Sequence, residues 1–385
     1  MRHHNSVMHG LLKHVPWSMF DQLVEDHDAD ARVRRLSTKS QFVALLYGQL
    51  AGAVSLREIE TAMGSHAARL YHLGARPVSR STLADANATR PHAVFSQLFS
   101  HMVGLAGRGF RRSTAEAVRL IDSTGLKLAG AASDWARFSA GVNGAKAHII
   151  YDPDADQPLY LEITPARTND ITAAKAMPIE PGATYVFDLG YYDYGWWARL
   201  DQAGCRIVTR LKSHTALDLV EDRPTPIGGA LTHDIIGFLP VRQGKSRQGN
   251  PFKDAVREIG VVLEDGKVLR VVTNDLDAPA QEIADLYKRR WAIELFFRWV
   301  KQTLRIKHFL GRSENAVRIQ VAVALIAYLL LRLAKDAVKI IESPLAFSRL
   351  VRANLMHRRA LDQLLRPPPP PRHDPRQLTL DLVAA

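Results

Sequence analysis

The sequence predicts a mixed α/β fold in which helical regions flank a sheet. Apolar residues recur with helical spacing before about residue 112 and after about residue 280. Short apolar segments of strand length lie between them, at 118–121, 147–151, 159–164, 185–187, 206–209 and 268–272. The first three strands should form a meander, and the later ones alternate with helices, which indicates a sheet of mixed direction.

The bulk composition indicates a folded protein with a polyanionic partner. The chain has 385 residues, enough for about two or three domains, and 46% of them are apolar. Its formal net charge of +12 favours nucleic acid or an anionic membrane as the partner, although a basic protein without such a partner would look the same. Cys205 is the single cysteine, so a disulfide framework and a multi-cysteine zinc site are excluded.

The excess charge is concentrated near the end of the chain. Residues 282–372 carry 18 Lys and Arg against 7 Asp and Glu, which is typical of a nucleic-acid footprint. The longest apolar run, 321–331, is shorter than the roughly 20 residues that a membrane span needs, and the first residues do not form a secretory signal. We therefore expect a buried helix at 321–331, no membrane partner and a cytoplasmic, bacterial setting.

The first 112 residues predict a helical region. One helix covers 38–48, and a second begins at Ser55, whose hydroxyl can cap it while Glu58 completes a capping box. A third covers 79–87 and contains Arg80 among serine, threonine and asparagine residues that suit contacts to phosphates and base edges. A helix, a break and a polar helix are typical of a helix-turn-helix DNA reader, but an ordinary helical bundle explains the pattern equally well.

The segments after the first five strands differ in character. Residues 213–267 are polar and turn-rich, and they predict a small β insertion. A long helix is expected at about 280–303, with further helices up to about residue 365. The proline run 367–371 begins a tail that we expect to be disordered.

Two acidic residues stand at the ends of predicted strands. Asp122 follows 118–121 and Asp188 follows 185–187, each with a glycine within the next three residues. Either aspartate alone is most simply a turn residue or a helix cap. Two of them at the sheet edge where ligands bind instead indicate a site for a hard cation such as Mg²⁺, which proteins hold with carboxylates.

A third carboxylate lies on the long helix. One narrow stripe, within about 60° around the helix axis, carries Tyr287, Arg290, Glu294 and Lys301. An apolar stripe runs beside it, and Trp291 and other aromatic residues on the remaining sides indicate an enclosed helix. A salt-bridged surface is the simpler explanation, but a carboxylate between cations beside a buried face is costly unless the stripe meets a ligand.

These residues resemble the Tyr-Arg-Glu-Lys signature of DDE transposases of the bacterial insertion-sequence-4 family. The resemblance covers most of the chain. It includes the segments around Asp122 and Asp188, the Lys146-Ala147-His148 segment, Thr273-Asn274 before the helix and 311–316 after it.

The resemblance implies a ribonuclease-H-like catalytic core with a β-rich insertion, for which the separation of 106 positions from Asp188 to Glu294 leaves room. It further implies that Asp122, Asp188 and Glu294 bind two Mg²⁺ ions, with Mn²⁺ as a substitute, and so catalyse phosphoryl transfer on DNA. Tyr287, Arg290 and Lys301 are then implied to contact DNA phosphates.

The expected organisation follows from the pattern and the resemblance together. It comprises a helical DNA-binding domain at 1–112, a catalytic domain at 113–335 with its insertion at about 213–267, a C-terminal helical region at 336–366 and a tail at 367–385. Arg80 and Lys146 are further expected DNA contacts. His148 beside Lys146 also has a place near the cleft, although a lone histidine on a strand is more often structural.

The expected function is transposition. The protein would bind the terminal inverted repeats of its insertion sequence, cut and join DNA strands, and act as a homodimer on double-stranded DNA of transposon ends and target, in the bacterial nucleoid. One alternative is a ribonuclease-H-like nuclease that does not transfer strands. Another is a non-catalytic DNA-binding protein derived from a transposase, which the intact set of three carboxylates disfavours.

Overall fold

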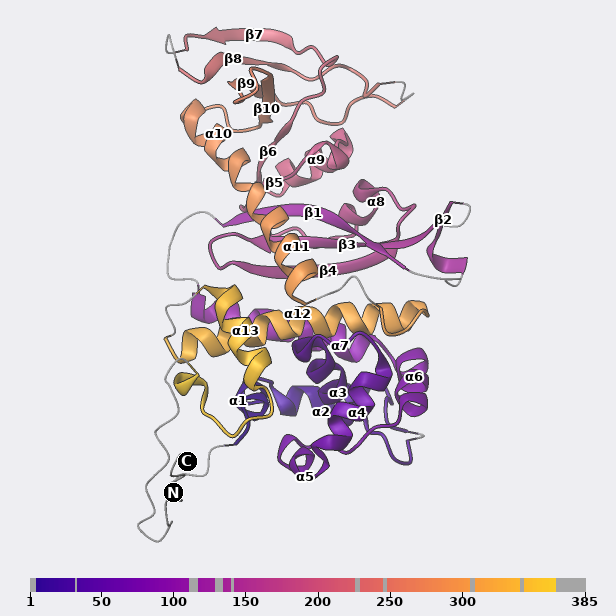
Figure 1. The fold of residues 1–385 in the computed structure, drawn as a ribbon. Coiled ribbons are helices and arrows are strands. Elements are labelled where there is room, and N and C mark those ends of the chain that lie inside the picture. The colour runs from indigo at the N-terminus through magenta and orange to yellow at the C-terminus, as the bar shows by residue number, and fades with distance from the viewer. Residues whose placement is uncertain are drawn as a thin grey trace, which may run out of the picture.

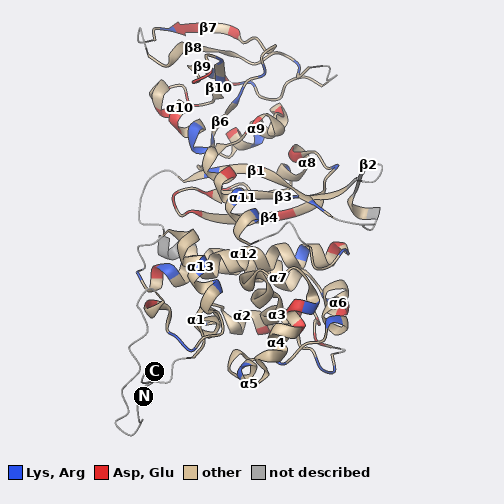
Figure 2. Cartoon of the chain, in the orientation of Figure 1, with Lys and Arg blue, Asp and Glu red and all other residues tan. Residues whose placement is uncertain are grey.

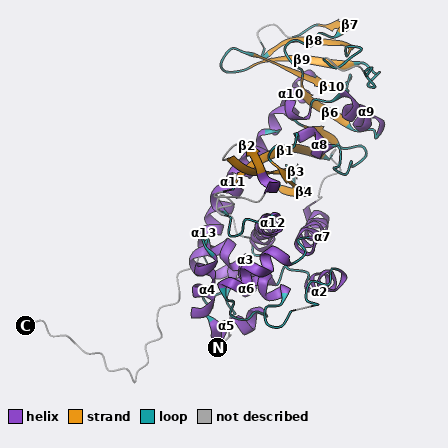
Figure 3. Ribbon diagram, turned by 90° about the vertical axis from the view of Figure 1, so that its right-hand side faces the viewer, coloured by secondary structure: helices purple, strands orange, loops and turns teal. Residues whose placement is uncertain are grey.

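A computed structural model describes residues 5–31, 33–110, 117–128, 134–139, 142–225, 229–244, 248–304, 309–339 and 343–364. The molecule is elongated, with helices gathered at one end and a sheet that extends away from them (Figure 1). The side view shows the same division between a helical region and a strand-rich region (Figure 3). The predicted tail at 367–385 lies outside the described residues.

The helical region is built from both ends of the chain. Its long helix α12 (Glu314–Ala337) packs against helices from the first part of the sequence, chiefly α7, α3 and α6, and against α13 (Pro344–Asn354). A last turn, η4 (Leu361–Gln363), follows α13. The helices of the first part are α1 (Val7–Leu12), α2 (Trp17–Asp26), α3 (Thr38–Ala51), α4 (Leu56–Ser65), α5 (Ala67–Leu70), the 3-10 turn η1 (Tyr71–Leu73), α6 (Arg80–Thr89) and α7 (Ala93–Phe110).

Helix α12 is long and apolar enough to cross a membrane, with a mean hydropathy of 1.9, but 83% of its apolar window is buried inside the protein. Figure 2 shows its middle part without charged residues, and this part lies between Arg318 and Arg332. The expectation of a buried helix at 321–331 is thereby confirmed, because every residue of that run is buried.

Two predicted helix starts in this region are confirmed by their caps. The hydroxyl of Ser55 accepts a hydrogen bond from the backbone N–H of Glu58, and the Glu58 carboxylate accepts one from the N–H of Val54. Ser79 caps α6 in the same way, accepting from the N–H of Thr82 at 3.3 Å. Each hydroxyl satisfies an N–H group that the first helical turn would otherwise leave without a partner.

One sheet of ten strands forms the rest of the molecule, in the order β2-β3-β1-β5-β6-β10-β9-β8-β7 with β4 paired to β3. Strands β1, β3 and β4 are antiparallel, which confirms the predicted meander, whereas β5 runs parallel to both β1 and β6. This is the ribonuclease-H-like mixed sheet that the sequence implies. The strands are β1 (Val118–Lys127), β2 (Arg137–Ser139), β3 (Val142–Asp152), β4 (Gln157–Pro165), β5 (Thr184–Val186), β6 (Arg206–Arg210), β7 (Asp218–Arg223), β8 (Leu231–Phe238), β9 (Val256–Val262) and β10 (Val268–Thr273).

The predicted β insertion extends the central sheet. Its strands β7, β8 and β9 pair in an antiparallel series that joins β10, and β10 in turn pairs with β6. A buried ion pair between Arg257 and Asp234 joins β9 to β8, with an N–O distance of 2.7 Å. Because paired neighbours satisfy the backbone groups of a strand edge, the insertion covers an edge that the core would otherwise expose.

Helices lie on both faces of the core sheet, as the alternation of strand side chains requires. Leu120, Val186 and Val208 share a buried cluster with Ile293 of α11. Their chain neighbours on the opposite face pack instead with the aromatic residues of α9. The helices associated with the sheet are η2 (Asp134–Ala136), α8 (Asp170–Ala174), η3 (Leu189–Tyr191), α9 (Tyr194–Gln202), α10 (Ala280–Arg289) and α11 (Trp291–Thr303).

The long helix expected at about 280–303 is divided at Arg290. The N–H of Arg290 donates to the carbonyl of Tyr287, and the N–H of Ile293 donates to that of Arg290, so two hydrogen bonds at the junction span three residues. Such bonds tighten the turn and separate α10 from α11. The expectation that this helix is enclosed is wrong for one side, because Trp291 and Leu295, four residues apart, are 51% and 47% exposed.

Candidate active site

Strand register brings the two predicted aspartates together. Leu120 of β1 pairs with Val186, the last residue of the parallel strand β5, so the residues two positions further on, Asp122 within β1 and Asp188 just after β5, lie near each other. Two residues are one full repeat of a strand, and Asp122 therefore shares the face of Leu120. That face is the one covered by α11.

The expectation that Asp122 ends its strand is wrong. Strand β1 continues to Lys127 because its antiparallel partner β3 pairs with it as far as Gly144, whereas the pairing to β5 stops at Leu120. Asp122 consequently lies inside β1, opposite Ile149, at the point where the parallel neighbour ends. Its carboxylate is fixed there by the backbone N–H of Ser123, which donates to it at 2.7 Å.

The environment of Asp122 disfavours its negative charge. Its pKa is raised to about 6, chiefly by burial and also by the nearby carboxylates of Asp188 and Glu294, against the opposing effects of the Ser123 N–H and of Arg290. Like charges held near one another in a partly buried site disfavour ionisation unless a cation is present. The three predicted carboxylates therefore interact in one site.

Asp188 also acts as a helix cap. Its Oδ1 accepts a hydrogen bond from the N–H of Gly190 at 2.8 Å at the start of η3. A Cβ atom on Gly190 would come within 3.0 Å of that same oxygen and within 3.3 Å of a carboxylate oxygen of Asp170. Glycine is thus the residue that leaves both carboxylates in place.

Arg290 links the helix to the strand. One guanidinium nitrogen lies 2.6 Å from Glu294, and the other lies 3.6 Å from Asp122. The guanidinium also stands 5.8 Å from the ring centre of the buried Tyr287. Because Arg290 occupies the junction between α10 and α11, both partners on the helix lie within one turn of it. The structure therefore brings together Tyr287, Arg290 and Glu294 of the predicted stripe.

An open cleft of about 390 Å³ adjoins these groups. Lys301 lines it together with Asp122 and Glu294, as the stripe predicts. Sequence reasoning missed Arg298 and Gln302, although their spacing of four and eight residues from Glu294 was a helical signal for the same face. The lining residues are Asp122, Ser123, Thr124, Glu294, Phe297, Arg298, Lys301 and Gln302.

A fourth carboxylate, Asp170, stands beside the site and was also missed. It accepts hydrogen bonds from Ser123 Oγ at 2.7 Å and from Lys146 Nζ at 3.1 Å, and it lies 3.7 Å from Nδ1 of His148. Lys146 also donates to the carbonyl of Thr168. The predicted Lys146 is thus near the site but is engaged with Asp170. No periodicity marks Asp170, since it follows a loop and begins the short helix α8.

The burial of His148 fits the structural role that is expected of a lone strand histidine. Its side chain is fully buried and its Nε2 is 2.8 Å from Thr164 Oγ1 on β4. Burial lowers its pKa to about 4, so the ring is neutral near pH 7. Arg80 is separate from all these groups, exposed at the first position of α6 in the helical region.

The donor atoms of this site suit a divalent cation. Carboxylate oxygens from Asp122, Asp188 and Glu294 are the ligands that hard cations prefer, and the carboxylates of Asp188 and Glu294 disfavour the charge of Asp122, an effect that a bound cation would offset. Within the described ranges, however, no three His, Cys, Asp or Glu side chains already form a cation cage. The guanidinium of Arg290 stands between two of the carboxylates instead.

Comparison with known proteins identifies the family to which the chain belongs. Residues 113–330 match the family described as the transposase DDE domain, and residues 3–76 match a domain of unknown function, DUF4372. The y4zB protein of Sinorhizobium fredii, named as a candidate transposase, is 41% identical over 307 residues, which are 78% of this chain and 86% of the relative.

One further relative is named as a transposase, and one solved structure aligns with the chain. The probable transposase for insertion sequence element IS5377 of Geobacillus stearothermophilus is 29% identical over 272 residues, which cover 67% of this chain and 68% of that protein. The solved piggyBac transposase synaptic complex with hairpin DNA aligns over 91% of this chain and 80% of its own, with 12% identity and a TM-score of 0.46.

The protein is therefore a DNA transposase, an enzyme whose partner is DNA. It belongs to the family of transposases with a DDE domain, whose members depend on divalent metal ions.

Proposed function

We propose that this protein binds the terminal inverted repeats of its own insertion sequence and moves the element by strand cleavage followed by strand transfer. The observation that carries the proposal is that Asp122 and Glu294 line one cleft, with Asp188 close enough to act on Asp122 and Arg290 beside Asp122 and Glu294. Carboxylates from strand β1, from the cap of η3 just after β5, and from helix α11 provide the donor set for a metal-dependent phosphoryl transfer.

We assign the metal to Mg²⁺, as two ions held by these three carboxylates, with Mn²⁺ as a substitute. Bound there, the ions would supply a nucleophilic oxygen and stabilise the leaving oxygen in an in-line displacement at phosphorus. Ser123 and Gly190 keep the two aspartates in position through their backbone N–H groups. Such a reaction requires no nucleophilic side chain.

The arginine and lysine of the helix stripe would hold the DNA strand. Arg290 is paired with Asp122 and Glu294 when no other cation neutralises them. Once they are neutralised, its planar fork is free to take a phosphate through two parallel hydrogen bonds. Lys301 at the cleft and Tyr287 beside Arg290 would complete this contact, with Lys146 reaching the strand from the side of Asp170.

We further propose how the molecule is organised. Residues 1–112, including Arg80, form the DNA-binding domain, 113–335 the catalytic domain, and 336–366 a C-terminal helical region. Two transposon ends must be held at once for cut-and-paste transfer, so the DNA complex is a homodimer, and the protein acts on the nucleoid in a bacterial cytoplasm.

The experiment separates cleavage from joining. Purified protein with Mg²⁺ receives an intact inverted-repeat end, or an end already cut to expose its 3′-OH, together with a target plasmid. We expect cleavage of the first and joining of the second to the target. Cleavage without joining would show a nuclease, and loss of both in an otherwise DNA-binding protein would remove the catalytic proposal.

A further inference from the structure

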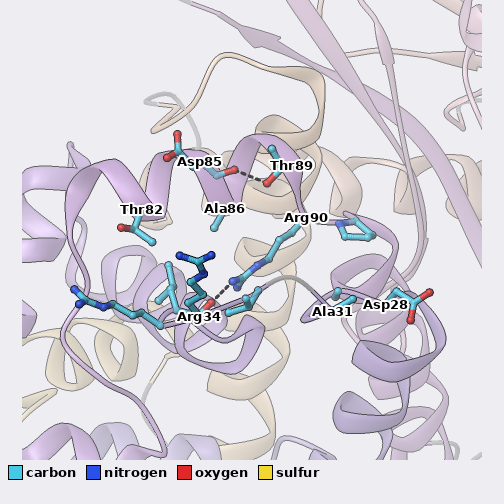
Figure 4. A pocket seen from close by; sticks show the side chains of 13 residues that line it. Asp28, Ala31, Arg34, Thr82, Asp85, Ala86, Thr89 and Arg90 are labelled. Carbon is cyan, nitrogen blue, oxygen red and sulfur yellow. Dashed lines mark hydrogen bonds between the residues drawn. The ribbon is translucent and has the colours of Figure 1, made fainter.

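The helical region contains an open groove of about 1110 Å³ that the catalytic site does not use (Figure 4). One wall is α6, which contributes Thr82, Asp85, Ala86 and Thr89. The other wall includes the segment 33–36 before α3, and Figure 4 shows Arg34 on the side of the groove opposite α6.

The arginines of this groove fall into two kinds. Arg90 is buried, and it donates to the carbonyl of Leu36 and, at 3.1 Å, to the side chain of Gln41. Arg34 and Arg35 are exposed instead. Neither has an ion-pair partner within 4.0 Å among the residues that the structure describes. Arg90 therefore builds the wall, whereas Arg34 and Arg35 leave their charge available.

The available charge continues along the surface. A neighbouring hollow of about 540 Å³ shares Arg34 and Arg35 and adds Arg76 and Tyr71. Arg76 is exposed, and Tyr71 is 82% exposed. Across the described part of the chain, no carboxylate lies within ion-pair distance of Arg76. Cations shared between two adjoining hollows suit an extended anion better than a small one.

The groove is supported by a rigid frame. A buried hydrogen bond of 2.8 Å joins Gln41 of α3 to Asn87 of α6. On the side of the segment before α3, Asp30 accepts from the backbone N–H and the hydroxyl of Thr38. Asp30 is therefore occupied at the start of α3 and does not neutralise the exposed guanidinium groups, although Asp28 and Asp85 also line the groove.

We propose that this groove binds the sugar–phosphate backbone of duplex DNA through Arg34 and Arg35. The inference rests on the proposed function, and it gives a role to the segment that matches a domain of unknown function. Guanidinium groups hold phosphates with two parallel hydrogen bonds, and the hydroxyl of Thr82 on the facing wall can donate to the same backbone. Such contacts position the duplex but do not read its sequence.

The test uses the full-length double variant Arg34→Gln/Arg35→Gln. Binding is measured by fluorescence anisotropy over a range of salt concentrations, on an inverted-repeat duplex and on a random duplex of equal length. Each lost phosphate contact should lower the slope of log K against log salt by about 0.9, so we expect a decrease of about 2. Both duplexes should be affected alike.

The matched control is Arg57→Gln/Arg349→Gln, which removes two exposed arginines of the same helical region outside the groove. It should leave the slope close to that of the wild type. Unchanged melting of the groove variant would show that it folds, as expected for exposed side chains. A groove variant with the wild-type salt slope would overturn the proposal.

The two proposals fail in different ways. If the groove is not used but wild-type protein still cuts and joins transposon ends, only the groove assignment is lost. If wild-type protein shows salt-dependent binding that the groove variant loses, yet joins no ends in Mg²⁺, the groove stands and the proposed function is wrong. Weakened binding to the inverted repeat alone would also overturn a backbone role, since it would show sequence reading.

Discussion

The catalytic cleft and the N-terminal groove both contain arginines, but they use them differently. In the cleft, Arg290 is paired with Asp122 and Glu294 and is partly buried. In the groove, Arg34 and Arg35 are exposed and meet no carboxylate at ion-pair distance within the described residues. An arginine held by carboxylates is placed with a defined geometry and can be released by a competing cation. An unpaired, exposed arginine contributes attraction to a polyanion at once.

This contrast predicts that changes in the cleft reduce cleavage and leave DNA affinity unchanged. The largest loss of cleavage is expected for variants of the three carboxylates. Asp122→Asn, Asp188→Asn and Glu294→Gln should each reduce metal-dependent cleavage of a transposon end to background. Changing the partners that merely orient metal ligands costs about 10- to 100-fold, so removing a ligand should exceed 100-fold. DNA affinity should remain, because the groove is untouched.

Single-turnover cleavage and a gel shift on the same preparation measure both effects. Asp265→Asn is the control, since this exposed carboxylate pairs with Lys267 in the β7–β10 part of the sheet. A variant of any one of the three residues that cleaves near the wild-type rate would remove that residue from the site.

The second effect concerns the geometry of Arg290. Arg290→Lys keeps the charge but loses the planar fork that spans two carboxylates or two phosphate oxygens. Misplacing the scissile phosphate by about an ångström can slow cleavage roughly 100-fold, with little change in affinity because one contact among many is altered.

Arg289→Lys is the matched comparison for Arg290→Lys. Arg289 is the preceding residue and pairs at the surface with Asp154, so the same substitution should leave cleavage nearly unchanged. Equal rates for the two variants in single-turnover cleavage would show that the stripe is an ordinary salt-bridged helix face. The cleavage rate of Lys301→Arg should lie between the rates of these two variants, because a lysine contributes one mobile charge and does not depend on a fixed fork geometry.

The smallest effect is expected at Asp170. Asp170→Asn keeps the size of the side chain but removes the charge that holds Lys146 and accepts from Ser123. We expect cleavage to slow about 10-fold, because Ser123 adjoins Asp122 and its position changes.

A double-mutant cycle with Lys146→Met measures whether Asp170 acts through the lysine. The double variant should be little worse than either single variant if the two side chains work as one unit. Additive losses in cleavage rate would show instead that Asp170 and Lys146 act independently, and unchanged cleavage in Asp170→Asn would exclude a positioning role.

The parts of the site that the sequence predicts are those with a local pattern. Tyr287, Arg290, Glu294 and Lys301 share one face because helical periodicity is fixed by the backbone itself. The structure divides the helix at Arg290, but the stripe persists because the junction keeps a helical backbone conformation, with φ −51° and ψ −30°. The Ser55 cap is equally local and is also confirmed, and Ser79 caps the helix whose start the sequence predicts there.

The position of Asp122 shows where local reasoning stops. The apolar run before it ends at Ile121, and a strand of that length was expected to end there too. Pairing with the antiparallel strand β3 extends β1 to Lys127. The apolar run 118–121 contains no information about this partner, which is a separate segment of the chain. Strand length is decided by the pairing as well as by hydrophobicity.

The sequence by itself determined the carboxylates, the stripe on the helix and the alternation of helices and strands, because each depends on spacing over a few residues. Only the tertiary structure decided that α12 is buried among helices from the first part of the chain, and that Asp170 stands beside Ser123. The tertiary structure also decided that β9 pairs with β10, and that Arg34 and Arg35 are exposed along a groove. All of these depend on contacts between segments far apart in the chain, which form through the burial of shared apolar surface and leave no periodic signal in either segment.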